Sequence, residues 1–165
     1  MDFVYVGKIV NTHGIKGELR IKSDFERKEL VFKEGVTLYI GKGFVPEKIT
    51  SYRKHKDYDM VTFLGYDNIN QVLNYKQMDV YVKREDLKLG SNDYLLQDII
   101  GFNVLENGET LGKVKEIVYN GSSILLYVEA EKNFYIPYND EYIKKVNLKE
   151  KNIEVYNAKD LIIWL

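Results

Sequence analysis

A glycine-bounded loop near the N-terminus carries the residue types best suited to holding a phosphate group. Residues 12–20 read Thr-His-Gly-Ile-Lys-Gly-Glu-Leu-Arg. Gly14 and Gly17 let the backbone turn sharply between two predicted strands, because glycine tolerates positive φ angles. The basic side chains brought together by the loop and by alternation along the second strand are Lys16, Arg20 and Lys22. This cluster could bind a phosphate backbone, and it could equally be an ordinary solvated surface.

The two histidines offer little basis for catalysis. His13 has no second His or Cys nearby and no carboxylate partner at a recognisable spacing, so we interpret it as a residue that caps the loop by hydrogen bonding. His55 lies between Lys54 and Lys56, where positive charge disfavours its protonation. We therefore predict no catalytic residues and no metal ligands, and we read residues 53–59 as the polar tip of a hairpin.

The composition narrows the possible chemistry further. With 165 residues, 45% of them hydrophobic and 30% charged, the chain can bury one ordinary core or two small ones. It contains no cysteine, which excludes disulfides, thiolate zinc sites and cysteine nucleophiles. No apolar run approaches the roughly 18 residues of a membrane span, and residues 1–5 do not resemble a signal peptide. We expect a cytoplasmic protein that has no membrane partner and no cofactor.

The net charge of -1 hides two halves of opposite sign. Residues 1–90 contain 16 Lys and Arg against 13 Asp and Glu, which gives +3, whereas residues 91–165 contain 8 against 12, which gives -4. A basic half favours phosphate and an acidic half favours a basic partner, because summed charge steers encounters. A general bias towards Lys, Asn, Ile and Tyr could also produce this composition.

Short apolar and β-branched runs separated by turn residues predict an all-β protein. In the first half these runs cover residues 4–10, 18–23, 37–40, 48–53, 60–64 and 80–82. One short helix is predicted to begin at Asp67 as its N-cap, with Ile69, Val72 and Leu73 on a shared face. We predict a first domain over residues 1–84 and a polar linker over residues 85–93.

The second predicted domain, residues 94–165, repeats this pattern. Its runs cover residues 102–105, 112–119, 124–128, 134–137, 143–148 and 153–156. Asn107-Gly108 and Asn120-Gly121 are typical of tight hairpin turns. Both halves are predicted to be small barrels, since closing a sheet removes exposed strand edges. The apolar tail, residues 160–165, is expected to pack back on the second barrel.

Several ordered motifs resemble the RimM family. The first is residues 13–20, His-Gly-Ile-Lys-Gly-Glu-Leu-Arg, placed after a strand that contains Gly7. Asp67-Asn68 before the predicted helix resembles the family's Asp-Arg-Asn, and residues 93–101 resemble the opening of its PRC-barrel domain. The resemblance continues at residues 112–114, 124–128 and 135–138, so it covers nearly the whole chain.

The resemblance implies a reductase/translation-factor-like barrel followed by a PRC barrel, acting as a monomeric, non-enzymatic factor in small-subunit maturation. Its implied partners are the immature small ribosomal subunit, 16S rRNA and ribosomal protein number nineteen. Combined with the charges, it suggests these RNA- or ribosome-binding residues: His13, Lys16, Arg20, Lys22, Arg53 and Lys54. The expected ribosomal-protein-binding residues are Tyr94, Leu95, Leu96 and Asp98, and the expected structural turns are Gly14, Gly17, Gly101 and Gly112.

The opening of the second domain departs from the family pattern. The family commonly has two adjacent Tyr followed by Trp there, whereas Tyr94 is followed by Leu95 and Leu96. Leucine keeps an apolar contact but provides no ring edge or hydroxyl.

Two other function classes remain as alternatives. A generic RNA-binding or adaptor module would use the same basic loop but would not require the ordered motifs of the second half. A small nuclease or phosphatase would need a carboxylate cluster for a metal ion or an activated nucleophile, and neither is visible in the sequence. Magnesium-dependent turnover of RNA would distinguish the enzyme from the other two.

Overall fold

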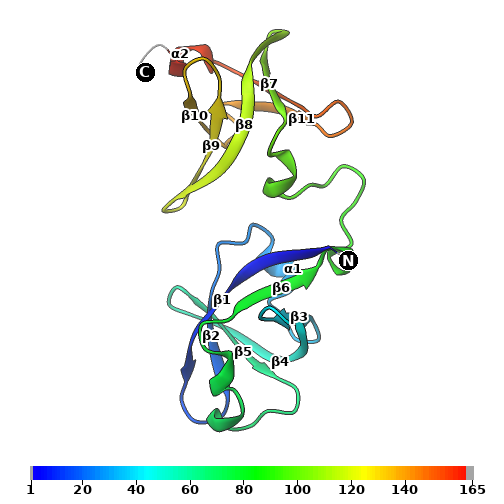
Figure 1. Ribbon diagram of the computed structural model, residues 1–165, viewed down its shortest axis with the longest axis vertical. Helices are drawn as coiled ribbons and strands as arrows, with labels where there is room; N and C mark the ends of the chain where they lie inside the picture. The colour runs from blue at the N-terminus through cyan, green and yellow to red at the C-terminus, as the bar shows by residue number, and fades with distance from the viewer. Residues whose placement is uncertain (1, 163–165) are drawn as a thin grey trace. The chain divides into compact units, whose positions relative to one another are not determined.

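A computed structural model describes residues 2–162, and the chain divides into two compact units, Met1–Leu89 and Gly90–Leu165. We call them unit 1 and unit 2. Almost all regular structure in both is β-strand (Figure 1). The predicted all-β fold in two tandem parts is therefore confirmed.

Unit 1 is a closed six-stranded barrel with the order β1-β2-β5-β4-β3-β6, in which β6 pairs back with β1 (Figure 1). Its strands are β1 Phe3–His13, β2 Glu18–Lys22, β3 Thr37–Ile40, β4 Val45–His55, β5 Tyr58–Phe63 and β6 Asp79–Lys83. Along β2, Leu19 and Ile21 are buried while Lys22 is exposed, as the predicted alternation requires. The charged side chains of β2 consequently lie on the outside of the barrel.

The helical segments of unit 1 differ from the prediction. The helix predicted to begin at Asp67 is two 3-10 turns, η1 Ile69–Gln71 and η2 Leu73–Tyr75, and the N-cap is Asn68. Val72 is buried but Leu73 is exposed, so the predicted shared face does not form. A short helix, α1 Lys28–Val31, buries Val31 and was not predicted. These segments are too short for helical periodicity to identify them.

Unit 2 is a six-stranded sheet in the order β10-β9-β8-β7-β12-β11 (Figure 1). Its strands are β7 Asn103–Glu106, β8 Glu109–Asn120, β9 Ser123–Glu129, β10 Phe134–Pro137, β11 Ile143–Asn147 and β12 Asn152–Val155. All pairs are antiparallel except β12 with β7. In contrast to unit 1, this order has two ends, β10 and β11. The core includes Phe102, Leu126 and Phe134.

Both predicted Asn-Gly turns join neighbouring strands, but they differ in detail. Asn107 and Gly108 both have positive φ angles, 49° and 82°, between β7 and β8. In the other turn, Asn120 is still paired with Ser123 at the end of β8, and only Gly121 has a positive φ angle. A turn with glycine at its first central position needs only one such angle.

The ends of the units contain short helical segments. The 3-10 helix η3, Arg84–Leu87, follows β6 and buries Leu87, and η4, Leu96–Ile99, opens unit 2. At the far end, α2 Lys159–Ile162 places Leu161 and Ile162 against the unit 2 core, as predicted for the tail. Residues 163–165 of that prediction lie outside the described residues. Within residues 2–162, no helix has the length and apolar character that a membrane crossing requires.

Candidate functional site

The loop between β1 and β2 is fixed by the strands that flank it and by its glycines. His13 and Glu18 are the last cross-strand pair before the turn. Gly14 and Gly17 have φ angles of 70° and 93°, a region that residues with a Cβ rarely adopt. The structure thus agrees with the turn expected at both glycines.

The loop also docks onto the segment that was expected to be a helix. The backbone N–H of Ile69 donates to the carbonyl of Ile15 at 2.9 Å. A Cβ added to Gly17 would lie 3.4 Å from backbone atoms of Asn68. Asn68 is itself fixed by a reciprocal cap, in which its side chain accepts from Asn70 and Gln71 accepts from its backbone. Two sequence motifs that are distant along the chain therefore form one rigid corner of unit 1.

Polar side chains from neighbouring strands surround the base of this loop. Arg20 Nη2 donates to His13 Nδ1 at 2.8 Å, and the guanidinium lies 5.2 Å from the ring centroid of Tyr58. Because arginine can only donate, His13 Nδ1 must be unprotonated in this arrangement. Arg53 forms a bidentate pair with Glu18, with both distances 2.8 Å. The residues that we call the loop cluster are His13, Lys16, Glu18, Arg20, Arg53 and His55.

The electrostatics of the loop cluster follow from these contacts. The hydrogen bond from Arg53 lowers the pKa of Glu18, and the same bond raises the pKa of Arg53. Loss of hydration, together with the charge of Arg53 and the neighbouring His13, lowers the pKa of His55. The two imidazole rings have centroids 5.5 Å apart. The cluster consequently favours a neutral His55 and a charged Glu18.

The remaining predicted basic residues occupy different positions. Lys16 is exposed in the loop, and Lys22 is exposed at the far end of β2, where it pairs with Lys8. Lys54 does not join the loop cluster, because adjacent residues on β4 point to opposite sides. Its Nζ lies 3.8 Å from Asp59 Oδ1.

Asp59 is the centre of a second polar network that the sequence analysis did not identify. It is only 1% exposed, accepts from Lys28 Nζ at 2.9 Å and accepts from the Tyr52 hydroxyl at 2.7 Å. Burial and the hydrogen bond to Asp59 raise the pKa of Tyr52 to about 12. The sequence analysis placed Asp59 only in the polar tip of a hairpin, residues 53–59. This network anchors α1 to β4 and β5.

The opening of unit 2 uses its predicted contact residues mainly for its own structure. Leu95 and Leu96 are buried, with exposed fractions of 0% and 4%, and Leu96 belongs to the core. Asp98 accepts from the backbone N–H of Leu95 at 2.8 Å, and the hydroxyls of Tyr94 and Tyr138 form a hydrogen bond. We correct the expectation for Leu95 and Leu96, because buried side chains offer a partner no surface. Tyr94 and Asp98 remain partly exposed.

The two expected turn glycines of unit 2 have different environments. Gly101 has a φ angle of 93° and open space where a Cβ would lie. Gly112 lies against β9, and a Cβ there would be 2.5 Å from the carbonyl oxygen of Glu129. Gly112 is therefore required by close backbone approach rather than by a turn.

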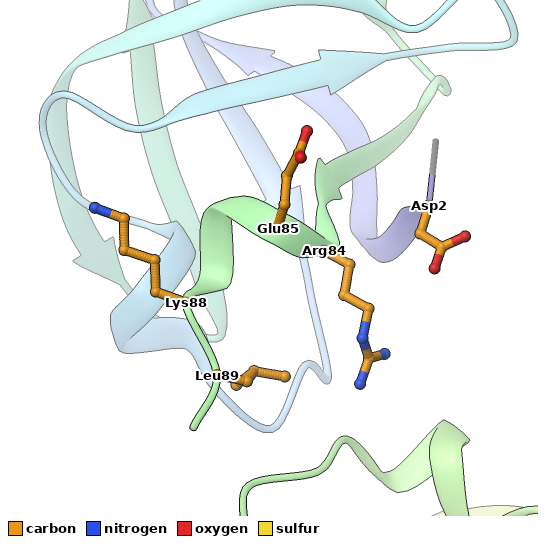
Figure 2. Close-up of a pocket in the computed structure, with 5 residues that line it drawn as sticks. All are labelled: Asp2, Arg84, Glu85, Lys88 and Leu89. Carbon is orange, nitrogen blue, oxygen red and sulfur yellow. The ribbon is translucent and has the colours of Figure 1, made fainter. Parts of the chain in front are cut away.

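A pocket of unit 1 lies away from the loop cluster. It is lined by Asp2, Arg84, Glu85, Lys88 and Leu89, on and beside η3 (Figure 2). Its two acidic and two basic side chains select neither sign of ligand charge. Across residues 2–162, no three His, Cys, Asp or Glu side chains gather in a way that could hold a metal ion.

Two known family models match this chain, one after the other along its length. The RimM N-terminal domain matches residues 4–87, and the RimM PRC barrel domain matches residues 96–161. The chain belongs to the RimM family. Family membership supports a role in ribosome maturation. The family is named for maturation and not for a catalysed reaction.

Curated relatives support the same assignment. A ribosome maturation factor RimM from Bacillus cereus is 38% identical over 165 residues, which covers 95% of this chain and 96% of the relative. One from Bacillus anthracis is 40% identical over 166 residues, with the same coverage.

Two solved RimM structures also align with the chain. A crystal structure described as a 16S ribosomal RNA processing protein RimM from Pseudomonas aeruginosa is 18% identical, covers 96% of this chain and 99% of that chain, and has a TM-score of 0.44. The solution structure of the RimM N-terminal domain from Thermus thermophilus is 21% identical, covers 53% of this chain and 95% of that chain, and has a TM-score of 0.45.

Proposed function

We propose that this chain assists assembly of the small-subunit head and 16S rRNA processing by binding rRNA through the loop cluster of unit 1. The loop cluster carries the proposal, because it presents basic side chains around a loop that is already fixed. Arg20 and Arg53 are held by His13 and Glu18, and Lys16 is exposed where it can approach a phosphate. Preformed sites lose less conformational entropy when they bind. The factor acts without catalysis of its own.

Unit 2 binds ribosomal protein number nineteen in this proposal. Its net charge of -4 over residues 91–165 complements a basic protein. Tyr94 and Asp98 are the contact residues that we retain, because both keep part of their surface accessible. Binding of purified ribosomal protein nineteen to the full chain should weaken as salt concentration rises. Salt-independent binding would contradict the charge argument, and absence of binding would remove this partner.

Co-sedimentation of the full chain with immature and mature small subunits tests the overall function. We expect retention on immature particles at low and moderate salt and little retention on mature ones. If the chain instead binds neither particle but still binds unrelated RNA, it is a generic RNA-binding module. If it binds neither immature particles nor RNA, the proposed function is wrong.

Charge-neutralising variants test the assignment to the loop cluster and the adjoining strand. We expect weaker binding to immature particles for the triple variant Lys16→Gln, Arg20→Gln and Lys22→Gln. The slope of the logarithm of the binding constant against the logarithm of salt concentration should also become smaller, by about one unit per lost phosphate contact. The matched control changes three exposed lysines elsewhere in unit 1: Lys33, Lys42 and Lys76. Equal losses in the two variants would show that only total charge matters. Thermal unfolding of both variants verifies that they are folded.

A further inference from the structure

The tip of the loop between β1 and β2 carries an apolar side chain beside the loop cluster, in which basic side chains outnumber the one acidic side chain, Glu18. Ile15 is 75% exposed, the highest fraction among the large hydrophobic residues that the structure describes. A single exposed aliphatic side chain is common on protein surfaces and needs no explanation by itself. Its backbone support and its charged surroundings distinguish this one.

The backbone around Ile15 is held by contacts with another segment, although the side chain is exposed. Its carbonyl accepts from the N–H of Ile69, and the adjoining Gly17 is buried against Asn68. The capped turn at Asn68 fixes this contact from the opposite side. An apolar side chain on a rigid support loses little entropy on binding, which is the property of an interface anchor.

The charges around Ile15 specify the chemistry of its partner. Lys16 follows it directly, and Arg20 lies at the base of the same loop. Arg53 lies there as well, where it is paired with Glu18, so the surroundings keep an excess of positive charge. A partner that reaches the apolar tip must therefore present negative charge around an apolar surface. RNA meets this requirement, since an unstacked base offers an apolar face between phosphates. Aliphatic side chains are also known to wedge between bases in nucleic-acid complexes.

We propose that Ile15 is an apolar anchor that packs against an unstacked base of the RNA bound by the loop cluster. This inference rests on the proposed function and deepens it. The phosphate contacts of Lys16 and its neighbours supply salt-dependent affinity, whereas the contact of Ile15 supplies affinity that does not depend on salt. The same loop would thus distinguish RNA with an accessible base from a regular duplex.

Binding of full-length variants to immature small subunits at three salt concentrations separates these two contributions. Ile15→Ser should bind about tenfold more weakly at every salt concentration, with an unchanged salt slope. Ile15→Val, which keeps an aliphatic side chain, should stay within about twofold. Lys16→Gln should instead reduce the salt slope by about one. Val45→Ser is the control for losing an exposed aliphatic residue elsewhere in unit 1 and should bind like the unaltered chain.

The outcomes distinguish a failure of the anchor from a failure of the function. If the unaltered chain binds immature particles and Ile15→Ser binds equally well, the anchor is wrong and the proposed function stands. If the unaltered chain does not bind these particles, both are wrong. A photo-crosslinking amino acid at position 15 identifies the partner. Crosslinks to rRNA support the anchor, and crosslinks confined to a ribosomal protein overturn it.

Discussion

The loop cluster of unit 1 and the opening of unit 2 were both expected to contact partners, and the fold uses them differently. In the loop cluster, the predicted basic residues remain at the surface and are linked by hydrogen bonds, such as Arg20 to His13. At the opening of unit 2, Leu95 and Leu96 are buried, and Asp98 caps the backbone. The difference teaches that the predicted basic residues kept their surface positions in one region, whereas an apolar pair next to a tyrosine did not do so in the other.

The two regions also differ in the structural role of their ordered backbone. The loop cluster uses its ordered backbone to hold an exposed corner, through Gly17 and Asn68. The opening of unit 2 uses η4 to place Leu96 and Ile99 in the core. Substitutions in the first region should therefore change binding more than stability, and substitutions in the second should do the reverse.

The largest expected effect is that of Leu96→Ala, which should lower the free energy of unfolding by about 2–5 kcal/mol through the cavity it leaves. Ile100→Ala, in the same segment but exposed, should change it by less than about 0.5 kcal/mol. Urea unfolding of both variants provides the measurement. If Leu96→Ala is as stable as the unaltered chain but loses particle binding, Leu96 is a contact residue after all and the distinction drawn above fails.

A smaller effect is expected at Gly112, where unit 2 needs close packing of backbones. Gly112→Ala places a Cβ 2.5 Å from the Glu129 carbonyl and should cost about 1–3 kcal/mol of stability. Gly43→Ala in unit 1 meets only Val45 at 3.9 Å and has no positive φ angle, so it should be neutral or slightly stabilising. Thermal unfolding compares the two. Equal stability of both variants would mean that β8 shifts to accept the methyl group.

The fold class could be predicted from the sequence because short apolar runs and turn residues carry local information. The burial pattern of β2 and the turn at Asn107-Gly108 follow from a two-residue period and from glycine conformations. The N-cap was misplaced by one residue, at Asp67 instead of Asn68. Both residue types can cap a helix, and Gln71 accepts from the backbone N–H of each. The hydrogen bond from the Asn70 N–H to the Asn68 side chain identifies Asn68 as the cap.

The parts of the site that escaped prediction depend on pairing between distant strands. Glu18 and Arg53 are 35 positions apart, and their contact requires the neighbouring order β2-β5-β4. Lys28, on α1, and Asp59, on β5, are 31 positions apart and meet only through the packing of the helix against the barrel. The periodicity of a single strand contains no information on its neighbours. Lys54 was grouped with Arg53 for a different reason: residues 53–59 were read as a hairpin tip, whereas β4 continues to His55 and places the two side chains on opposite sides.

Tyr52→Phe sharpens the comparison between the loop cluster and the Asp59 network behind it. Loss of the hydrogen bond to Asp59 should cost about 0.5–1.5 kcal/mol. The folded pKa of Tyr52, about 12, lies above that of an unfolded tyrosine, so this stabilisation is present below about pH 10 and is lost as pH rises towards the folded value. Ultraviolet titration of Tyr52→Phe should show one fewer tyrosine that ionises near pH 12. Tyr5→Phe, at an exposed position, is the control and should change stability by less than about 0.5 kcal/mol.

The smallest expected effect is the pH dependence that the loop cluster gives to unit 1. The pKa of His55 is lowered by loss of hydration and by Arg53. As pH falls, His55 is therefore protonated in the unfolded chain at a higher pH than in the folded protein. The contribution of His55 to the stability of unit 1 is complete above about pH 6.5, the pKa of an unfolded histidine. It is lost as pH falls through the folded pKa. Glu18, whose pKa is lowered by Arg53, adds a second loss below about pH 4.3. Urea unfolding across this range should show that His55→Gln removes only the upper step and Glu18→Gln only the lower one. If both variants retain both steps, the pH dependence originates outside the loop cluster, because the upper step is assigned to His55 and the lower step to Glu18.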